Sequence, residues 1–244
     1  MNIAIDAGNS STKIALIEEG RVVETLRTTH LDREFLHSLW QRLDGCVTRV
    51  VLSSVVDVPA QVEEFLNSHT DGYLRVTAAT PMPLRNLYAT PHTLGIDRLA
   101  AAVGAATIYP SSNVLVVDLG TAMTVDIVTA RGEFLGGNIT LGAEGRFRAL
   151  NQFTARLPLV EKPDEEAAWG YDTASAIQSG VVRGMTYELE GYIARANEEF
   201  EDLKIIFTGG DAKYFAKRLK NAIFATSDLV VLGLNTILEY NATN

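Results

Sequence analysis

Two aspartates, each at the end of an apolar segment and each followed by a glycine and hydroxyl residues, are the side chains best suited to chemistry. Asp6 begins "DAGNSST" and Asp118 begins "DLGTAMT". Glycine lets backbone amides approach a phosphate, and neighbouring hydroxyls add hydrogen-bond donors. A carboxylate at such a turn can hold a cation that bridges phosphate oxygens. Each Asp-x-Gly alone could be only a hairpin turn, but the pair favours phosphate binding.

A third glycine-containing turn lies near the end of the chain. In "FTGGDA", Gly209 and Gly210 separate an apolar segment from an expected helix. Paired glycines at a helix start permit close approach of a flat ring or a phosphate. A strand, two glycines and a helix in succession are also common in loops that bind no ligand. Together with the two phosphate turns, this one is interpreted as the adenosine end of a nucleotide site.

The segment "LGIDRLAAA" places a carboxylate, Asp97, next to a guanidinium, Arg98, at an expected helix start near Ile96. Asp97 could simply be a first-turn carboxylate that stabilises the helix dipole. Arginine at a helix start is unfavourable for that dipole, however, and its planar fork suits a carboxylate ligand. We therefore interpret Asp97 as a general base and Arg98 as a substrate anchor.

An internal repeat indicates how these residues are positioned. The segments "IDAGNSSTKIALIEEGRVV" and "VDLGTAMTVDIVTARGEFL" align without a gap. Asp6 then matches Asp118, Gly8 matches Gly120, and Gly20 matches Gly132. Each copy predicts three strands joined by two tight turns. Gene duplication explains the match, and the two turns would face each other across a cleft.

Apolar periodicity predicts the remaining elements. Helices are expected at 34–43, 60–67 and 212–219 and from 229 onward, and strands at 49–56, 73–76 and 204–210, with a short strand in "AIFAT". Prolines 81, 83 and 91 mark a loop-rich connection. The pattern predicts an α/β protein of two related lobes, at 1–110 and 111–244, each a mixed sheet with flanking helices. A helical insertion at about 143–200 could form a dimer surface or a substrate wall.

Composition restricts the class of protein. The 244 residues are 47% hydrophobic and carry a net charge of −9, which suits a folded core and disfavours binding to nucleic acid or to an anionic membrane. The single cysteine suits a reducing compartment. No apolar run is long enough for a membrane span and the chain begins directly with a strand. We expect a soluble cytoplasmic protein.

The motifs "DAGNSS", "SSVV", "LGIDR", "DLGTAMTVD", "GGNI" and "TGG" occur in the order and spacing found in the type III pantothenate kinases of bacteria. The resemblance covers essentially the whole chain. It implies the actin-like ATPase fold of two ribonuclease H-like lobes, within the acetate and sugar kinase, Hsp70 and actin superfamily. It also implies ATP-dependent phosphorylation of pantothenate, the first committed step towards coenzyme A.

The resemblance also implies roles for individual residues. Asp97 is similar to the family's proton acceptor, Asp118 to its ligand for K⁺ or NH₄⁺, and Thr173 to a substrate-contacting threonine contributed across a homodimer interface. Asp6 would place Mg²⁺ through water. Pantothenate would also contact Tyr88, Gly95, Ile96 and Arg98, and ATP would contact Asp6, Gly8, Asn9, Ser10, Ser11, Thr12, Thr121, Gly209 and Gly210. Lys13 is assigned to the ATP phosphates, with a solvated strand lysine as the alternative.

The chain departs from the family pattern at two places. Ser10 stands where the family usually has threonine, which keeps the hydroxyl, and Leu141 stands where it commonly has proline before Gly142. Two other functions stay open at this point. One is a sugar, amino-sugar or acetate kinase of the same superfamily, and the other is a nonenzymatic regulator that keeps the nucleotide cleft.

Overall fold

The computed structural model describes residues 1–243, which divide into two compact units. Unit 1 comprises residues 1–111, 128–135 and 228–244, and unit 2 comprises residues 112–127 and 136–227. The last helix therefore belongs with the first part of the chain. The two contiguous lobes, 1–110 and 111–244, stay a prediction. Among residues 1–243, no helix combines the length and the apolar character that a membrane crossing requires.

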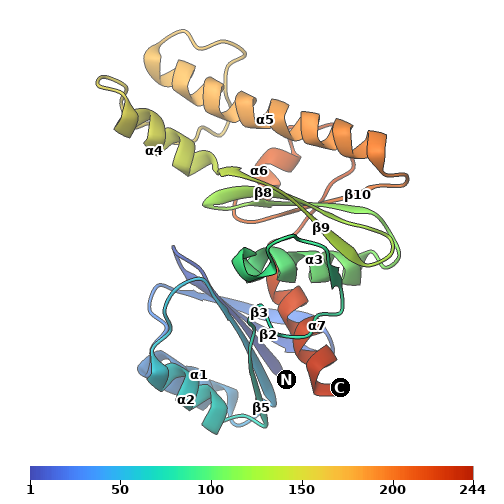
Figure 1. Ribbon diagram of the computed structural model, residues 1–244. Helices are drawn as coiled ribbons and strands as arrows, with labels where there is room; N and C mark the ends of the chain where they lie inside the picture. Colours follow the sequence, from blue (N-terminus) through green and yellow to red (C-terminus); the bar gives the residue numbers. More distant parts are fainter. Residues whose placement is uncertain (244) are drawn as a thin grey trace. The chain divides into compact units, whose positions relative to one another are not determined.

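Unit 1 is built on a five-stranded mixed sheet with the strand order β3-β2-β1-β4-β5. β1, β2 and β3 are antiparallel neighbours, and β4 and β5 run parallel to β1. Helices α1 and α2 cover one face, and α3 and α7 lie on the other (Figure 1). The bounds are β1 Asn2–Ala7, β2 Thr12–Glu18, β3 Arg21–Thr28, α1 Arg33–Leu43, β4 Arg49–Ser54, α2 Ala60–Ser68, β5 Gly72–Arg75, α3 Ile96–Ile108 and α7 Leu229–Thr243.

Alternation along β1 explains how its two faces differ. Ile3 and Ile5 point into the apolar core that Leu36 of α1 and Phe65 of α2 complete. Successive residues of a strand point to opposite faces, so Asp6 lies on the other face, which α3 and α7 cover. The strand thus places one carboxylate beside two helix starts while its apolar residues fill a core.

Two glycines let α3 and α7 approach each other closely. A Cβ at Gly233 of α7 would lie 1.7 Å from the carbonyl oxygen of Ala100 in α3. A Cβ at Gly104 of α3 would lie 2.4 Å from the carbonyl oxygen of Leu229. The backbones are therefore in direct contact, and no larger residue fits at either position without moving a helix.

The second sheet repeats the strand order of the first. Its six strands run β11-β10-β7-β8-β9-β6, so that β9-β8-β7-β10-β11 correspond one by one to β3-β2-β1-β4-β5. β10 and β11 run parallel to β7, as β4 and β5 do to β1. This confirms the duplicated fold. The bounds are β6 Arg85–Asn86, β7 Val114–Leu119, β8 Ala122–Val128, β9 Glu133–Leu141, β10 Lys204–Thr208 and β11 Phe224–Ala225.

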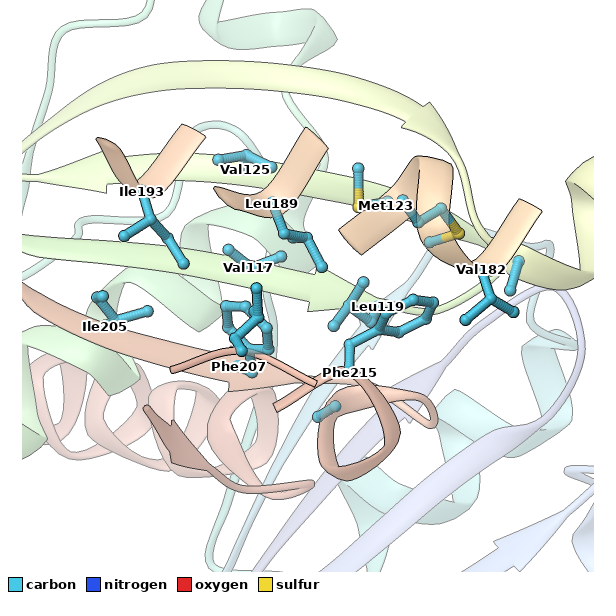
Figure 2. Close-up of a cluster of buried hydrophobic side chains, with 14 of the residues drawn as sticks. Val117, Leu119, Met123, Val125, Val182, Leu189, Ile193, Ile205, Phe207 and Phe215 are labelled. Atoms are coloured by element: carbon cyan, nitrogen blue, oxygen red, sulfur yellow. The ribbon is translucent and has the colours of Figure 1, made fainter. Parts of the chain in front are cut away.

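Unit 2 buries its own apolar core between this sheet and α5 (Thr173–Glu199). Figure 2 shows Leu189 and Ile193 of α5 pointing toward Val117 of β7, with Val182 farther along the helix on the side of Leu119. Helix α5 starts at a capping box in which Asp172 and Ser175 bond each other's backbone amides. The core and the cap together hold the longest helix of the described chain on one face of the sheet.

Most expected elements are present, with shifted ends. Strand β10 stops at Thr208 instead of 210 because Gly209 adopts a positive φ of 86°. The expected insertion at 143–200 is two helices, α4 (Ala143–Phe153) and α5, with no regular structure at 154–172. Helix α6 covers only Ala212–Ala216, and the proline-rich connection holds β6 and the short helix Pro91–Thr93.

Substitution of Gly233 by alanine tests the contact between α3 and α7. Because the added Cβ would overlap a backbone carbonyl, we expect the free energy of unfolding to fall by about 3 kcal/mol. Gly191→Ala in α5 is the control, since its Cβ would meet no atom within 4 Å and alanine raises helix propensity by up to about 1 kcal/mol. Urea denaturation of both variants measures the difference. If Gly233→Ala and Gly191→Ala were equally stable, α3 and α7 would have moved apart to accommodate the added methyl group at no cost in free energy.

Candidate active site

The first glycine turn joins β1 to β2 directly after Asp6. The turn is closed by a backbone hydrogen bond in which the Gly8 amide donates to the Ser11 carbonyl at 3.2 Å. Asn9 and Ser10 are exposed at its tip, whereas Thr12 and Lys13 are buried. A cavity of about 200 Å³ lies beside the turn, lined by Gly8 to Thr12 and by the loop from Val56 to Pro59. Backbone amides and hydroxyls therefore line a space open to a small anion.

Asp6 lies among charged and hydroxyl groups. In the sheet it is paired with Lys13 on β2 and with Ser53 on β4. Burial and the nearby charge of Asp97 raise the pKa of the Asp6 carboxyl to about 6, while the positive charges of Lys13 and Arg27 oppose the shift. The carboxylates of Asp6 and Asp97, both predicted as site residues, are therefore close enough to repel each other electrostatically. A carboxylate in such a position would be stabilised by a cation.

Asp97 lies in the first turn of α3, as expected, and its position depends on Gly95. Oδ1 of Asp97 accepts a hydrogen bond from the backbone amide of Arg98 at 2.8 Å. A Cβ at Gly95 would lie only 2.3 Å from the same oxygen. The glycine at the N-cap therefore leaves the space that the carboxylate occupies. Gly95, Ile96 and Asp97 are each partly accessible.

Arg98 is buried against two aromatic rings of the same unit. Its guanidinium carbon lies 5.4 Å from the ring centroid of Tyr88 and 5.9 Å from that of Phe134. Arginine is well suited to such planar contacts. The structure thus brings together Tyr88 and Arg98, which were predicted as substrate residues, and adds Phe134, which was not.

The second glycine turn belongs to unit 2 and gathers a different set of groups. Asp118 of β7 lies opposite Thr208 of β10. A Cβ at Gly209 would lie 2.5 Å from Oδ1 of Asp118, and one at Gly120 would lie 3.4 Å from it. Gly209 also has the positive φ that favours glycine. Backbone from the turn at Gly120 and from the turn at Gly209 therefore lies close to the Asp118 carboxylate. Thr121, which follows Gly120, is exposed.

The loop that departs from the family pattern contacts this turn. The Gly142 amide donates to the Thr121 carbonyl at 3.0 Å, and a Cβ at Gly142 would lie 2.0 Å from the Gly120 carbonyl oxygen. Gly142 is therefore required by close packing. Leu141 before it is half exposed, so no backbone contact of this turn depends on a proline at that position.

A larger polar cavity of about 760 Å³ adjoins Gly210. Its wall includes Lys213, Tyr214 and Arg218 from α6 and the segment that follows it. The guanidinium carbon of Arg218 lies 3.6 Å from the ring centroid of Tyr214, and Arg218 is ion-paired with Glu166 at 2.8 Å. The cavity is thus next to the predicted adenosine turn and has an aromatic wall.

Thr173 is the first residue of α5 and is exposed. It lines an apolar groove of about 850 Å³ between α4 and α5, together with Leu150, Phe153, Ile177 and other residues. The predicted substrate residues of unit 1 and Thr173 therefore belong to different units.

Two charged residues of unit 1 were missed by the sequence interpretation. Asp228, immediately before α7, pairs with Lys13 at 2.6 Å, so the alternative of a solvated lysine is wrong. Arg27 of β3 donates to the Ser11 hydroxyl at 3.4 Å.

Residues 1–243 contain no group of three or more histidine, cysteine, aspartate or glutamate side chains able to share a metal ion. A Mg²⁺ at Asp6 would therefore need water and phosphate oxygens to complete its coordination, as is usual for this ion.

The raised pKa of Asp6 predicts a stabilising substitution. The folded chain holds the Asp6 proton up to about pH 6 and the unfolded chain only up to about pH 4. The contribution of Asp6 to the stability of the ligand-free protein is therefore lost as pH rises through this window. Because the carboxyl is partly accessible, we expect Asp6→Asn to raise the free energy of unfolding at pH 7.5 by about 1–2 kcal/mol, with no gain at pH 4.

Urea denaturation without nucleotide or metal, at both pH values, measures this effect. Asp57→Asn is the matched control, because Asp57 is exposed and lines the same cavity. A loss of stability in Asp6→Asn at pH 7.5 would show that Lys13 and Arg27 fully offset the cost of burying this charge.

Known proteins match the whole length of the chain. A family model described as type III pantothenate kinase matches residues 2–195. The type III pantothenate kinase of Phocaeicola vulgatus is 41% identical over 99% of both chains. The enzyme of the same name from Bacteroides fragilis (strain ATCC 25285) is 40% identical, over 99% of this chain and 98% of the relative.

Solved structures support the fold alone. A protein from Campylobacter jejuni described as a Baf family transcriptional activator superposes with a TM-score of 0.64 at 21% identity, over 99% of this chain and all of the other. A ROK family protein from Streptococcus pneumoniae gives 0.51 at 14% identity, over 100% and 99% of the two chains. The family model and the full-length relatives go further than the fold and show that the chain belongs to the type III pantothenate kinase family.

Proposed function

We propose that Asp97 is the base with which this kinase phosphorylates pantothenate. Membership of the family gives the reaction: a phosphoryl group passes from ATP to pantothenate, in the biosynthesis of coenzyme A. The hydroxyl oxygen of pantothenate forms a bond to the γ-phosphorus, its proton passes to the Asp97 carboxylate, and the bond from γ-phosphorus to ADP breaks. The observation that carries the proposal is the space that Gly95 leaves for the Asp97 carboxylate.

The acceptor is assigned to unit 1. Tyr88, Gly95, Ile96 and Arg98 lie around Asp97 or on the same helix start. Arg98 contacts two aromatic rings, and its fork suits the carboxylate of pantothenate. A sugar kinase of this superfamily would share the glycine turns but would have no use for an arginine anchor beside the base. The arginine therefore favours pantothenate over a sugar.

The nucleotide is assigned to the glycine turns. The Gly8 to Thr12 turn, with Lys13, would contact phosphates, and Thr121 would contact ATP from the second turn. The cavity beside Gly210, with Tyr214 in its wall, suits the adenosine. Mg²⁺ held through water by Asp6 would neutralise charge on the phosphates. Asp118 would hold K⁺ or NH₄⁺, with backbone oxygens near Gly120 and Gly209 as further ligands. That both turns bind one nucleotide stays a prediction from the repeat in the sequence.

We also propose that the chain is a homodimer formed through α4 and α5. The side chains of Phe153 and Tyr187 are 81% and 61% exposed, and Gly180 and Gly184 leave open space on α5. Exposed apolar side chains next to an apolar groove are typical of an interaction surface. Thr173 at the edge of that groove would then reach the acceptor bound by the partner subunit. A cytoplasmic location stays a prediction from the sequence.

Replacing the base tests the proposal. Because a positioned general base contributes about 10²–10⁴-fold to turnover, we expect Asp97→Asn to lower kcat by that factor while ATP binding survives. Gly95→Ala keeps the carboxylate and displaces it, so it should also lower kcat. Formation of phosphopantothenate and binding of a fluorescent ATP analogue are measured for each variant. Near-normal turnover in Asp97→Asn would show that Asp97 is not the general base.

The cation assignment predicts a dependence on potassium. With pantothenate as acceptor, the wild-type chain should form product in potassium or ammonium buffer and much less in sodium buffer. Asp118→Asn should abolish this difference between buffers. Equal rates in sodium and potassium would contradict the cation site. A panel with sugars and acetate as acceptors is the control. If one of them is a better substrate than pantothenate, the assignment of pantothenate as the acceptor is wrong.

A further inference from the structure

Lys13 is a buried cation held by a residue distant in the sequence. Its side chain is only 9% exposed, and its Nζ lies 2.6 Å from Oδ1 of Asp228, whose side chain is 32% exposed. A buried ammonium is costly unless it is paired and hydrogen-bonded. The short contact with a carboxylate is therefore a substantial constraint on where the Lys13 ammonium lies.

The two residues come from elements with fixed positions in unit 1. Lys13 is directly opposite Asp6 in the antiparallel pair of β1 and β2. Asp228 directly precedes α7, and its carbonyl oxygen accepts a helical hydrogen bond from the Leu232 amide at 2.9 Å. Helix α7 is held in turn by the glycine contacts with α3. Asp228 is thus placed by packed backbone rather than by a loose loop.

Lys13 also lies next to the carboxylate that is assigned to the metal. Lysine has a flexible four-carbon stem, so its ammonium needs a partner to stay in one place. Directly opposed residues of two strands have Cβ atoms about 5 Å apart, well within reach of a lysine. The carboxylate of Asp6 already interacts electrostatically with the charge of Lys13. Without Asp228 it would be a replacement partner, and an ion pair there would compete with Mg²⁺.

We propose that Asp228 is a positioning residue of the kinase: it holds the Lys13 ammonium where an ATP phosphate can meet it and away from the metal-holding carboxylate of Asp6. The inference rests on the proposed role of Lys13 and Asp6 in binding Mg·ATP. Asp228 itself touches neither substrate. Its effect is therefore confined to the nucleotide side of the reaction.

Kinetics of Asp228→Asn test this role. A lost charge-assisted hydrogen bond predicts a rise in KM for Mg·ATP of about tenfold, a higher Mg²⁺ requirement, and no change in KM for pantothenate. Asp228→Glu keeps the charge and should recover most of the nucleotide affinity. Glu239→Gln is the matched control, because Glu239 lies on the same helix and pairs with Arg49 of the same sheet at 3.3 Å. It should leave both KM values unchanged.

A double-mutant cycle shows whether Asp228 acts through Lys13. Lys13→Met alone should raise KM for Mg·ATP, and adding Asp228→Asn to Lys13→Met should change it no further. Binding of a fluorescent ATP analogue gives the same comparison without turnover, and thermal melts show whether each variant folds. If Asp228→Asn does not fold, Asp228→Glu and the Lys13→Met background still report on the coupling through nucleotide binding.

The outcomes separate the two levels of the proposal. A wild-type chain that forms no phosphopantothenate contradicts the proposed function. An active wild type with an Asp228→Asn variant of unchanged or lower KM for Mg·ATP contradicts the positioning role. A variant that melts at a lower temperature but keeps its KM values shows a purely structural ion pair, which also overturns the inference.

Discussion

The direct contact of two helix backbones at Gly104 and Gly233 is the constraint on which the chemistry of unit 1 depends. It fixes α3, which carries Asp97 and Arg98 in its first turn, and α7, which begins after Asp228. Both helices cover the same face of the sheet, where Asp6 and Lys13 also lie. Small changes in the crossing would therefore move the proposed base Asp97 and the Lys13–Asp228 ion pair together. Close-packed interiors transmit such shifts rather than absorb them.

Duplication supplied two similar turns whose neighbouring residues differ. Asp6 and Asp118 occupy equivalent places in two sheets of the same strand order, and each faces a hydroxyl residue on the adjacent parallel strand. The position equivalent to Lys13 in the second copy is Val125. The first turn therefore has an ammonium opposite its carboxylate in the sheet, at a position where the second copy has an apolar side chain. This asymmetry suits a division in which one turn serves phosphates and metal and the other a monovalent cation.

Local patterns in the sequence predicted much of the fold and part of the site. The repeat identified the strands around both aspartates, and the start of α3 followed from "LGIDR" because a helix start has a local signature. Asp228 had none: its partner Lys13 lies at the other end of the chain, and a contact made only by tertiary packing leaves no periodic trace. Phe134 was missed for the same reason. The end of β10 was misplaced because the backbone conformation of Gly209 depends on Asp118 beneath it.

The buried carboxylate of Asp6 would also link the supply of nucleotide to the lifetime of the protein. A buried charge that is only partly offset when the site is empty makes the vacant chain open more often, and proteases act on opened chains. A ligand that brings a cation to that site would stabilise the folded state by mass action. Under the proposed role of Asp6, abundant nucleotide would then slow degradation of the enzyme, and depletion of nucleotide would speed it.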